Sequence, residues 1–405
     1  MNQRELFFKH LGQTSPAPLA LEILRAEGLY LYDAGGKKYL DAIGGISVCN
    51  TGHRHPVVVQ AIRDQADRYL HILVYGELIQ SPQVEYAHML ARHLPLSLQS
   101  VFFTNSGSEA TEGAMKLAKR VTGRTEIVGF ENSYHGSTQG ALSVIGDEYW
   151  RNAFRPLLPG VLHLRYNHPE DLKWITEKTA CVIAETVQAE NGVIKPVPEW
   201  IRELRKKCDD TGALLILDEI QVGFGRTGTL WGFEQYGVVP DIVLLGKALG
   251  GGLPLGAFIA SKTWMDSFTD RPVLGHISTF GGHPLSCAAG LAAFKLLLNE
   301  NQVSGDSKNL KALQENLISA VAEKENLFQE LLVHPSIKKL RTAGLLIAVE
   351  VENFETNKRI IDACIRDGLL TDWFLFASNC LRITPPLTIS KTEIEEVCRI
   401  ILKNC

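Results

Sequence analysis

The sequence has 405 residues, of which 45% are hydrophobic and 21% are charged, so it predicts a soluble globular protein with two domains or one large domain and a smaller appendage. Its 41 basic and 45 acidic residues give a net charge of −4, which argues against a nucleic-acid partner and favours small-molecule partners. Because it has neither a signal-peptide pattern near Met1 nor an apolar run of the ~18 residues that a membrane span needs, we expect a cytoplasmic protein that does not enter membranes.

The first 48 residues predict an N-terminal arm. Gly28–Tyr32 is strand-like, turn residues follow from Asp33 to Lys37, and a glycine-rich segment runs from Gly44 to Gly52.

From about residue 57 the pattern alternates between amphipathic segments and short apolar runs. The amphipathic segments, which predict helices, are Val57–Tyr69, Ser81–Leu94 and Glu109–Val121. The apolar runs are Val101–Phe103, Glu126–Phe130, Val182–Ala184, Leu214–Leu217, Ile242–Leu245 and Ala257–Ala260. Short apolar runs bounded by turns suit strands that are buried on both faces, so we predict a mostly parallel sheet covered by helices.

After about residue 285 the pattern predicts a smaller α+β unit. It contains a helix over Cys287–Leu298, a strand over Gly344–Val351 and a final helix over Thr392–Leu402. We therefore predict an N-terminal arm that joins the small domain (1–48), a large domain (49–285) and a C-terminal small domain (286–405).

Eight cysteines are scattered along the chain without a C-x-x-C pair. This spacing predicts reduced, structural cysteines and no metal site.

Two charged residues stand where α/β sheets place ligand chemistry. Asp218 ends the run ALLILD, and Lys247 follows DIVLLG. A buried amine at a strand end is a good nucleophile toward a carbonyl, and a carboxylate beside it can pair with a protonated pyridine nitrogen. Taken singly, Asp218 could cap a helix and Lys247 could be solvated; together they predict a site for pyridoxal phosphate (PLP).

A phosphate site is predicted at Asn105-Ser106-Gly107-Ser108-Glu109, which follows a strand and opens a helix. Free N–H groups at a helix N-terminus bind phosphate. The alternative is a plain helix cap at Ser108.

A third motif, Gly223 to Gly228, formally matches the dinucleotide fingerprint G-x-G-x-x-G. We reject a nicotinamide dehydrogenase because Thr229–Gly232 is not helix-like and the nearest following acids, Glu234 and Asp241, come too early.

Over nearly its whole length the chain resembles the class III aminotransferases, the group that contains acetylornithine, ornithine and 4-aminobutyrate aminotransferases. The segments that carry the resemblance are NSGSEA, YHG, LDEIQVGFGRTG, LLGKALGGGLPLG and HISTFGGHPLS, in the family's order. The resemblance implies a PLP-dependent transferase of fold type I.

The resemblance also implies roles for the cofactor site. Lys247 is expected to hold PLP as a Schiff base and to shuttle a proton, and Asp218 to hold the pyridine nitrogen. Thr279 is expected to reach the phosphate of the other subunit, which implies a homodimer with shared active sites. The remaining cofactor residues that it implies are Ser106, Gly107, Ser108, Tyr134, His135, Glu185 and Gln221.

On the substrate side, Arg382 corresponds to the arginine that binds the α-carboxylate, and Glu190 to a glutamate that pairs with it and swings away when 2-oxoglutarate enters. The alternative for Glu190 is a solvated loop acid. Ser137 replaces the arginine with which many members bind a distal carboxylate, and Ile46 replaces a tyrosine of ornithine aminotransferases. We therefore expect an unusual donor pocket, in which Arg151 or Arg155 could compensate for Ser137.

Three functions remain open at this point. The first is amino transfer from an amine or amino acid of the ω-amino acid or ornithine-like class to a keto acid such as 2-oxoglutarate. The second is another PLP reaction on the same fold, by a racemase, aminomutase or phospholyase. The third is a catalytically silent binding protein.

Overall fold

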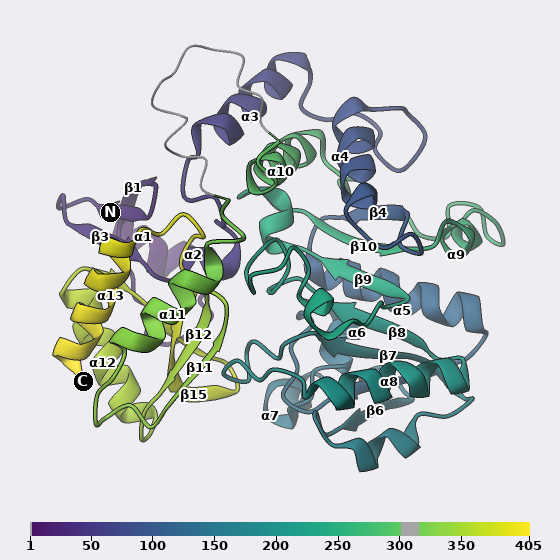
Figure 1. The fold of residues 1–405 in the computed structure, drawn as a ribbon. Helices are drawn as coiled ribbons and strands as arrows, with labels where there is room; N and C mark the ends of the chain where they lie inside the picture. Colours follow the sequence, from purple (N-terminus) through teal and green to yellow (C-terminus); the bar gives the residue numbers. More distant parts are fainter. Residues whose placement is uncertain (1, 301–315) are drawn as a thin grey trace.

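The computed structural model describes residues 2–300 and 316–405, which form a larger and a smaller part side by side (Figure 1). Both chain ends lie in the smaller part, at the left of the figure. Residue 1 and residues 301–315, which belong to the predicted small-domain segments, lie outside the described residues. Among the described helices, none has the length and apolar character that crossing a membrane requires.

The larger part is built on a seven-stranded sheet with the order β4-β10-β9-β8-β7-β5-β6. The bounds are β4 (Ser100–Thr104), β5 (Glu126–Phe130), β6 (Val161–Leu164), β7 (Thr179–Glu185), β8 (Leu214–Asp218), β9 (Ile242–Leu245) and β10 (Gly256–Ala260). Within this sheet β10 runs antiparallel to both of its neighbours, and the other pairs are parallel. The predicted α/β fold with a mostly parallel sheet is confirmed.

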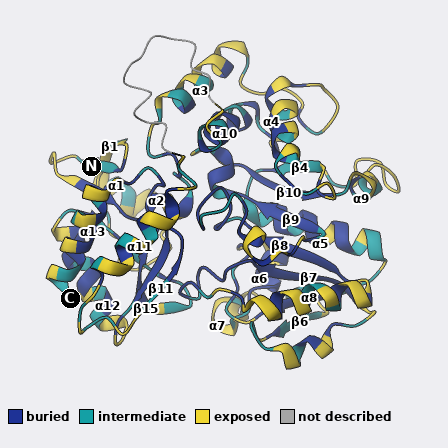
Figure 2. Ribbon diagram, in the orientation of Figure 1, coloured by how far each residue is buried: buried dark blue, intermediate teal, exposed yellow. Residues whose placement is uncertain are grey.

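The apolar runs form strands because helices cover both faces of the sheet. Along β8, Leu215 belongs to the same hydrophobic cluster as Leu204 of α8 (Pro198–Thr211), whereas the next residue, Ile216, belongs to a second cluster with Met115 of α5 (Gly107–Thr122). Since successive side chains of a strand point to opposite faces, every position of such a strand is apolar. Figure 2 shows these strands buried beneath helices whose outer faces are exposed.

Strand β6 was not predicted, because its sequence Val-Leu-His-Leu lies at the sheet edge and keeps Leu162 exposed. The predicted helices are present with slightly shifted ends as α3 (Pro56–Arg68), α4 (Ser81–Arg92) and α5. α10 (Pro284–Leu297) packs against α3 and α4.

The smaller part contains two four-stranded sheets, with the orders β11-β12-β15-β14 and β1-β2-β3-β13. The bounds are β1 (Ile23–Glu27), β2 (Tyr30–Asp33), β3 (Lys38–Asp41), β11 (Lys339–Ala343), β12 (Leu346–Glu350), β13 (Leu369–Leu370), β14 (Asp372–Phe374) and β15 (Ala377–Ile383). Because β13 pairs with β3, the N-terminal arm joins the C-terminal segment in one sheet. The exact domain boundaries stay a prediction.

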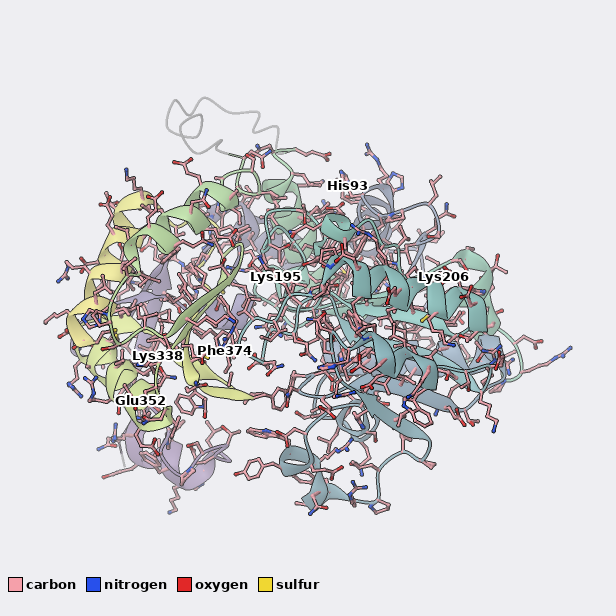
Figure 3. All side chains as sticks on the ribbon, turned by 60° about the horizontal axis from the view of Figure 1, so that its bottom comes forward. His93, Lys195, Lys206, Lys338, Glu352 and Phe374 are labelled. Carbon is pink, nitrogen blue, oxygen red and sulfur yellow. The ribbon has the colours of Figure 1, made fainter. Side chains whose placement is uncertain are left out.

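Helices α11 (Val321–Leu331), α12 (Phe354–Arg366) and α13 (Lys391–Asn404) complete the smaller part. The shorter elements are α1 (Gln3–His10), α2 (Gly44–Ser47), α6 (Gln139–Ser143), α7 (Glu148–Arg151), α9 (Lys262–Met265), η1 (Asn152–Phe154), η2 (Pro169–Trp174), η3 (Gly232–Tyr236), η4 (Lys247–Gly250) and η5 (Asp266–Phe268). In Figure 3, Phe374 lies on the side of the smaller part that faces the larger one.

A buried arginine ties the two parts together. Arg226 donates from Nη1 to the carbonyl oxygens of Leu345 (3.0 Å) and Pro385 (2.5 Å), and from Nη2 to Oδ1 of Asn50 (2.5 Å). Burial lowers the pKa of Arg226 to about 9. Arg226 belongs to the glycine-rich motif Gly223–Gly228, which forms a turn and opens no helix, so the rejection of a dinucleotide fingerprint was right.

Candidate active site

A cavity of about 790 Å³ lies between the two parts, a size typical of small-molecule sites. All predicted site residues except Thr279 line it; these are Ile46, Ser106, Gly107, Ser108, Tyr134, His135, Ser137, Glu185, Glu190, Asp218, Gln221, Lys247 and Arg382. They come from strand ends and loops of the large sheet, from α2 and from β15 of the smaller part. Thr279 is exposed and lies outside this cavity.

Asp218, at the carboxyl end of β8, is buried and held by contacts on both oxygens. Its Oδ2 lies 2.7 Å from Nδ1 of His135, and its Oδ1 accepts the Ile220 N–H at 2.9 Å. These contacts fix the orientation of a carboxylate at the cavity wall, where it can bind a protonated ring nitrogen.

Lys247 follows β9 and opens the short helix η4. Its Nζ donates to Oε1 of Gln221 at 3.0 Å. Burial lowers the pKa of Lys247, although the carboxylates of Glu190, Asp218 and Glu185 act in the opposite direction. A lowered pKa leaves more of the amine as the free base, which is the form that reacts with carbonyl groups.

Helix α5 points its N-terminus at the cavity. Ser106 is the helix cap, since its Oγ accepts the Glu109 N–H at 3.2 Å, so the alternative of a cap at Ser108 was wrong. Among the described residues, no hydrogen bond uses the N–H of Gly107 or Ser108. These N–H groups can bind an anion such as a phosphate.

A glycine packs against this helix end. Gly136 has φ of +121°, and a Cβ placed there would overlap the side chain of Ser108. The backbone of the loop after Tyr134 can therefore approach the helix closely only because residue 136 is glycine.

Glu185, at the end of β7, supports the loop that carries Tyr134. Its Oε1 accepts the Tyr134 N–H at 2.9 Å, and its Oε2 accepts the Ala189 N–H at 3.0 Å. Burial, together with the nearby charge of Asp218, raises the pKa of Glu185 well above its usual range.

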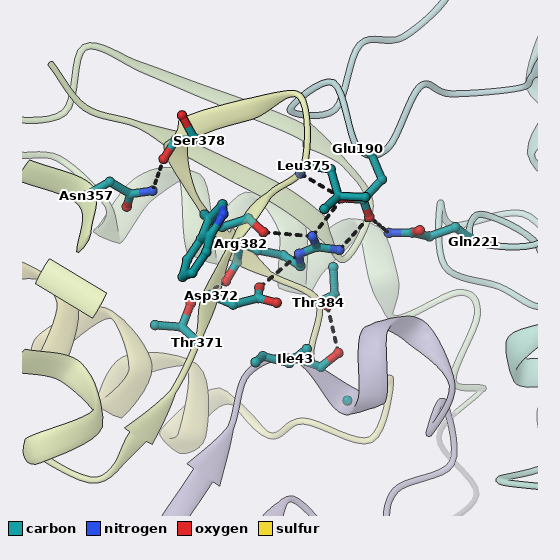
Figure 4. A network of polar contacts seen from close by, with 12 residues as sticks. Ile43, Glu190, Gln221, Asn357, Thr371, Asp372, Leu375, Ser378, Arg382 and Thr384 are labelled. Carbon is teal, nitrogen blue, oxygen red and sulfur yellow. Dashed lines mark hydrogen bonds and ion pairs between the residues drawn. The ribbon is translucent and has the colours of Figure 1, made fainter. Parts of the chain in front are cut away.

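Arg382 and Glu190 form a buried ion pair, although they belong to different parts of the molecule (Figure 4). Nη1 of Arg382 donates to Oε1 of Glu190 at 2.7 Å, and Nη2 donates to Oε2 at 2.9 Å. Burial acts to raise the pKa of Glu190, but the charge and hydrogen bonds of Arg382 bring it below its ordinary value. The alternative of a solvated loop acid was therefore wrong: Glu190 is 4% exposed.

Several residues that line the cavity were not predicted from the sequence, notably Asp372, Trp373 and Leu375 on β14 and the turn after it. The sequence signal that could have found them is the acid in the apolar run Asp372–Phe376, which a hairpin places opposite Arg382.

Neither Arg151 nor Arg155 lines the cavity, and among the described residues that do, Lys247 and Arg382 are the only lysine or arginine side chains. Arg151 and Arg155 both pair with Glu148 instead. Ser137 itself lies near Tyr134, with 3.2 Å between the two hydroxyl oxygens.

Three groups that line the cavity fit PLP, which is a flat aromatic aldehyde with a phosphate tail. A fixed carboxylate (Asp218) suits its ring nitrogen, a deprotonatable amine (Lys247) suits its aldehyde, and the α5 N-terminus suits its phosphate. All three line one cavity.

Known proteins resemble this chain over almost its full length. A family model described as aminotransferase class-III matches residues 12–404. Acetylornithine aminotransferase from Methanopyrus kandleri is 39% identical over 400 residues, which cover 98% of this chain and 97% of that protein.

Solved structures share the fold. An (S)-enantioselective ω-transaminase from Thermomicrobium roseum has a TM-score of 0.87 at 29% identity, covering 98% of this chain and 96% of the other. Ornithine aminotransferase from Toxoplasma gondii, whose active site has partial occupancy of PLP, has a TM-score of 0.87 at 29% identity, covering 99% of this chain and 93% of the other.

Proposed function

This chain belongs to the class III aminotransferases, which makes PLP its cofactor, and we propose that it moves an amino group from an ω-amino acid or ornithine-like donor to a keto acid, with 2-oxoglutarate as the acceptor. The relatives named acetylornithine aminotransferase support this donor class. The observation that carries the proposal is that the fork of Arg382 binds the carboxylate of Glu190 in the same cavity as Lys247.

PLP, when bound, supplies the group that accepts and returns nitrogen and acts as an electron sink. In our proposal Lys247 holds the cofactor covalently and moves the proton at the substrate's reacting carbon, a task that its lowered pKa favours. Asp218 holds the ring nitrogen, and His135 orients Asp218.

The other predicted residues complete the proposed cofactor site. Ser106, Gly107 and Ser108 hold the phosphate at the N-terminus of α5, Gln221 contacts the phenolic oxygen, and Tyr134 covers the ring. Glu185 keeps the Tyr134 loop in place.

Glu190 and Arg382 are proposed to serve two substrates in turn. While an ω-amine donor reacts, Glu190 covers Arg382; when the keto acid enters, its α-carboxylate takes the place of Glu190 on the same two nitrogens. Such a site suits a reaction in which two different substrates alternate, which favours amino transfer over the racemase, aminomutase and phospholyase alternatives. Ile46 and Ser137 are proposed to contact the donor.

We also propose a homodimer in which Thr279 of one subunit contacts the phosphate in the other. Thr279 lies between the exposed apolar side chains of Ile277 and Phe280. The ring centroids of Phe280 and His71 lie 4.7 Å apart, so residues 277–280 contact the segment Leu70–Ile79, most of which is exposed. An apolar surface of this kind favours association. The eight free cysteines support a reducing compartment, the cytoplasm.

The test is a donor panel on purified protein loaded with PLP. Ornithine, acetylornithine, 4-aminobutyrate, lysine and putrescine are added singly, and the loss of the cofactor's visible absorbance is followed by its return on addition of 2-oxoglutarate or pyruvate. We expect at least one ω-amine to bleach the band and 2-oxoglutarate to restore it. Lys247→Ala should abolish both changes, and bleaching by no donor would refute the proposal.

A further inference from the structure

Arg382 has a second carboxylate partner that the proposed reaction does not use. Oδ1 of Asp372 lies 2.9 Å from Nε of Arg382, on the opposite side of the guanidinium from Glu190 (Figure 4). Asp372 also lines the cavity, and the side chain of Arg382 is only 2% exposed.

The strand that carries Asp372 holds Arg382 by several contacts. Asp372 of β14 is the direct antiparallel partner of Arg382 in β15. Nη2 of Arg382 donates to the Trp373 carbonyl oxygen at 2.9 Å, and its Cζ lies 4.5 Å from the centroid of the Phe374 ring. None of these contacts involves Glu190, so a movement of Glu190 does not by itself remove them.

These contacts divide the guanidinium into two sides. The Nε edge faces Asp372, whereas Nη1 and Nη2 present the fork that now binds Glu190. A buried arginine that loses its carboxylate partner is left with an uncompensated charge and no fixed direction. A permanent partner on the Nε edge prevents both effects.

We propose that Asp372 is a positioning residue that keeps the fork of Arg382 directed into the cavity while Glu190 is exchanged for the α-carboxylate of the keto acid. This inference rests on the proposed function of Arg382. It predicts that Asp372 matters for substrates with a carboxylate on the reacting carbon and not for substrates without one.

The protonation of Asp372 gives an independent signature. Burial raises the pKa of Asp372 to about 6; Arg382 on β15 acts to lower it, whereas Glu190 on the loop after β7 and Asp41 on β3 act to raise it. Below this pH the carboxyl group is neutral and loses its charge interaction with Arg382. The Michaelis constant for a keto acid should therefore rise as the pH falls through about 6.

The experiment compares 2-oxoglutarate with 4-oxobutanoate, which is the same molecule without the α-carboxylate. In the holoenzyme, Asp372→Ala should raise KM for 2-oxoglutarate about tenfold, because Arg382 loses a close ion-pair contact, and leave KM for 4-oxobutanoate within about twofold. Asp372→Asn should raise KM for 2-oxoglutarate by a smaller factor. In wild type the ratio of KM for 2-oxoglutarate to KM for 4-oxobutanoate should rise below about pH 6, whereas in Asp372→Asn this rise should be absent. Asp362→Asn, at a half-buried acid of α12 that pairs with Lys358 away from the cavity, is the control.

A binding measurement separates this inference from the function on which it rests. The dissociation constant of 2-oxoglutarate for the PLP form, read from a shift in the cofactor's absorbance, requires no transfer of nitrogen. If wild-type protein turns over no donor but Asp372→Ala still weakens this binding about tenfold, the proposed function fails and the positioning role stands. The positioning role would be overturned if Asp372→Ala lost affinity equally for 2-oxoglutarate and 4-oxobutanoate. It would also be overturned if Asp372→Ala kept its cofactor and bound 2-oxoglutarate as tightly as wild type.

Discussion

At the scale of single residues, Lys247 combines burial with an uncommon backbone conformation. Its φ is +46°, in the left-handed region that residues with a side chain rarely adopt. Such strain persists only where the surrounding structure holds the residue in place, and it is concentrated at functional sites. Gly251, with φ of +59°, ends the short helix η4 that Lys247 opens.

Ser137 is the residue that should set the choice of acceptor. We expect Ser137→Arg to lower KM for 2-oxoglutarate about tenfold and leave KM for pyruvate unchanged, because the added guanidinium can bind a distal carboxylate that pyruvate lacks. Steady-state kinetics with both keto acids measures this. Ser137→Leu, which adds bulk without charge, serves as the control; an equal change in both KM values would count against a distal-carboxylate site here.

The residue types at the site and the pairing of Glu190 with Arg382 were predictable, but the partner of Asp218 was not. Asp218 and Lys247 could be selected because each ends a local apolar run. His135, which contacts Asp218, is 83 residues away in the chain, so only the folded sheet brings the two together.

At the scale of elements, the joint between α5 and the loop after Tyr134 shapes the proposed phosphate site. We expect Gly136→Ala to weaken PLP binding about tenfold, because the new methyl group displaces Ser108 and φ of +121° is strained for alanine. Absorbance titration of the apoprotein with PLP measures the affinity.

Gly12→Ala is the matched control, since a Cβ there meets nothing within 4 Å. Titration with pyridoxal, which lacks the phosphate, should show a much smaller difference between Gly136→Ala and wild type. A difference as large as that with PLP would argue for damage to the ring site instead of the phosphate site.

Elements buried on both faces were predicted well, and exposed or short ones poorly. β5 and β9 have the predicted bounds because every residue in them except Glu126 is apolar or glycine. β6 at the sheet edge, and β14 with only three residues, carry too little pattern to be recognised.

At the scale of the whole molecule, the proposed dimer makes the cofactor site dependent on association. Ile79 is 96% exposed and Phe280 is 52% exposed, beside Thr279. We expect Ile79→Asp combined with Phe280→Asp to convert the dimer to a monomer, because two charges cannot be buried in an apolar interface without partners. Sedimentation velocity measures the association state.

Loss of the dimer should also weaken PLP binding, since Thr279 then reaches no phosphate. Val333→Asp, at an exposed apolar residue of the smaller part, is the control and should change neither quantity. A double variant that stays dimeric, or a monomer that keeps full cofactor affinity, would contradict the shared-site proposal.

The sequence alone determined the features that depend on residues close together along the chain. The mostly parallel sheet follows from apolar runs of a few residues, because hydrophobic periodicity is local. The predictions at Asp218, Lys247 and the N-terminus of α5 follow from strand ends and a helix start, whereas the other proposed cofactor residues were predicted from the family resemblance. Family membership follows from the same local motifs, which occur along almost the whole chain.

The family resemblance implied that Glu190 pairs with Arg382, but only the tertiary structure decided how the rest of the proposed substrate site is assembled. Glu190 and Arg382 are 192 residues apart and lie in different parts of the molecule, and Asp372 enters the network because a short hairpin places it opposite Arg382. No local pattern encodes such contacts, because burial and charge pairing act through space between segments that meet only after folding.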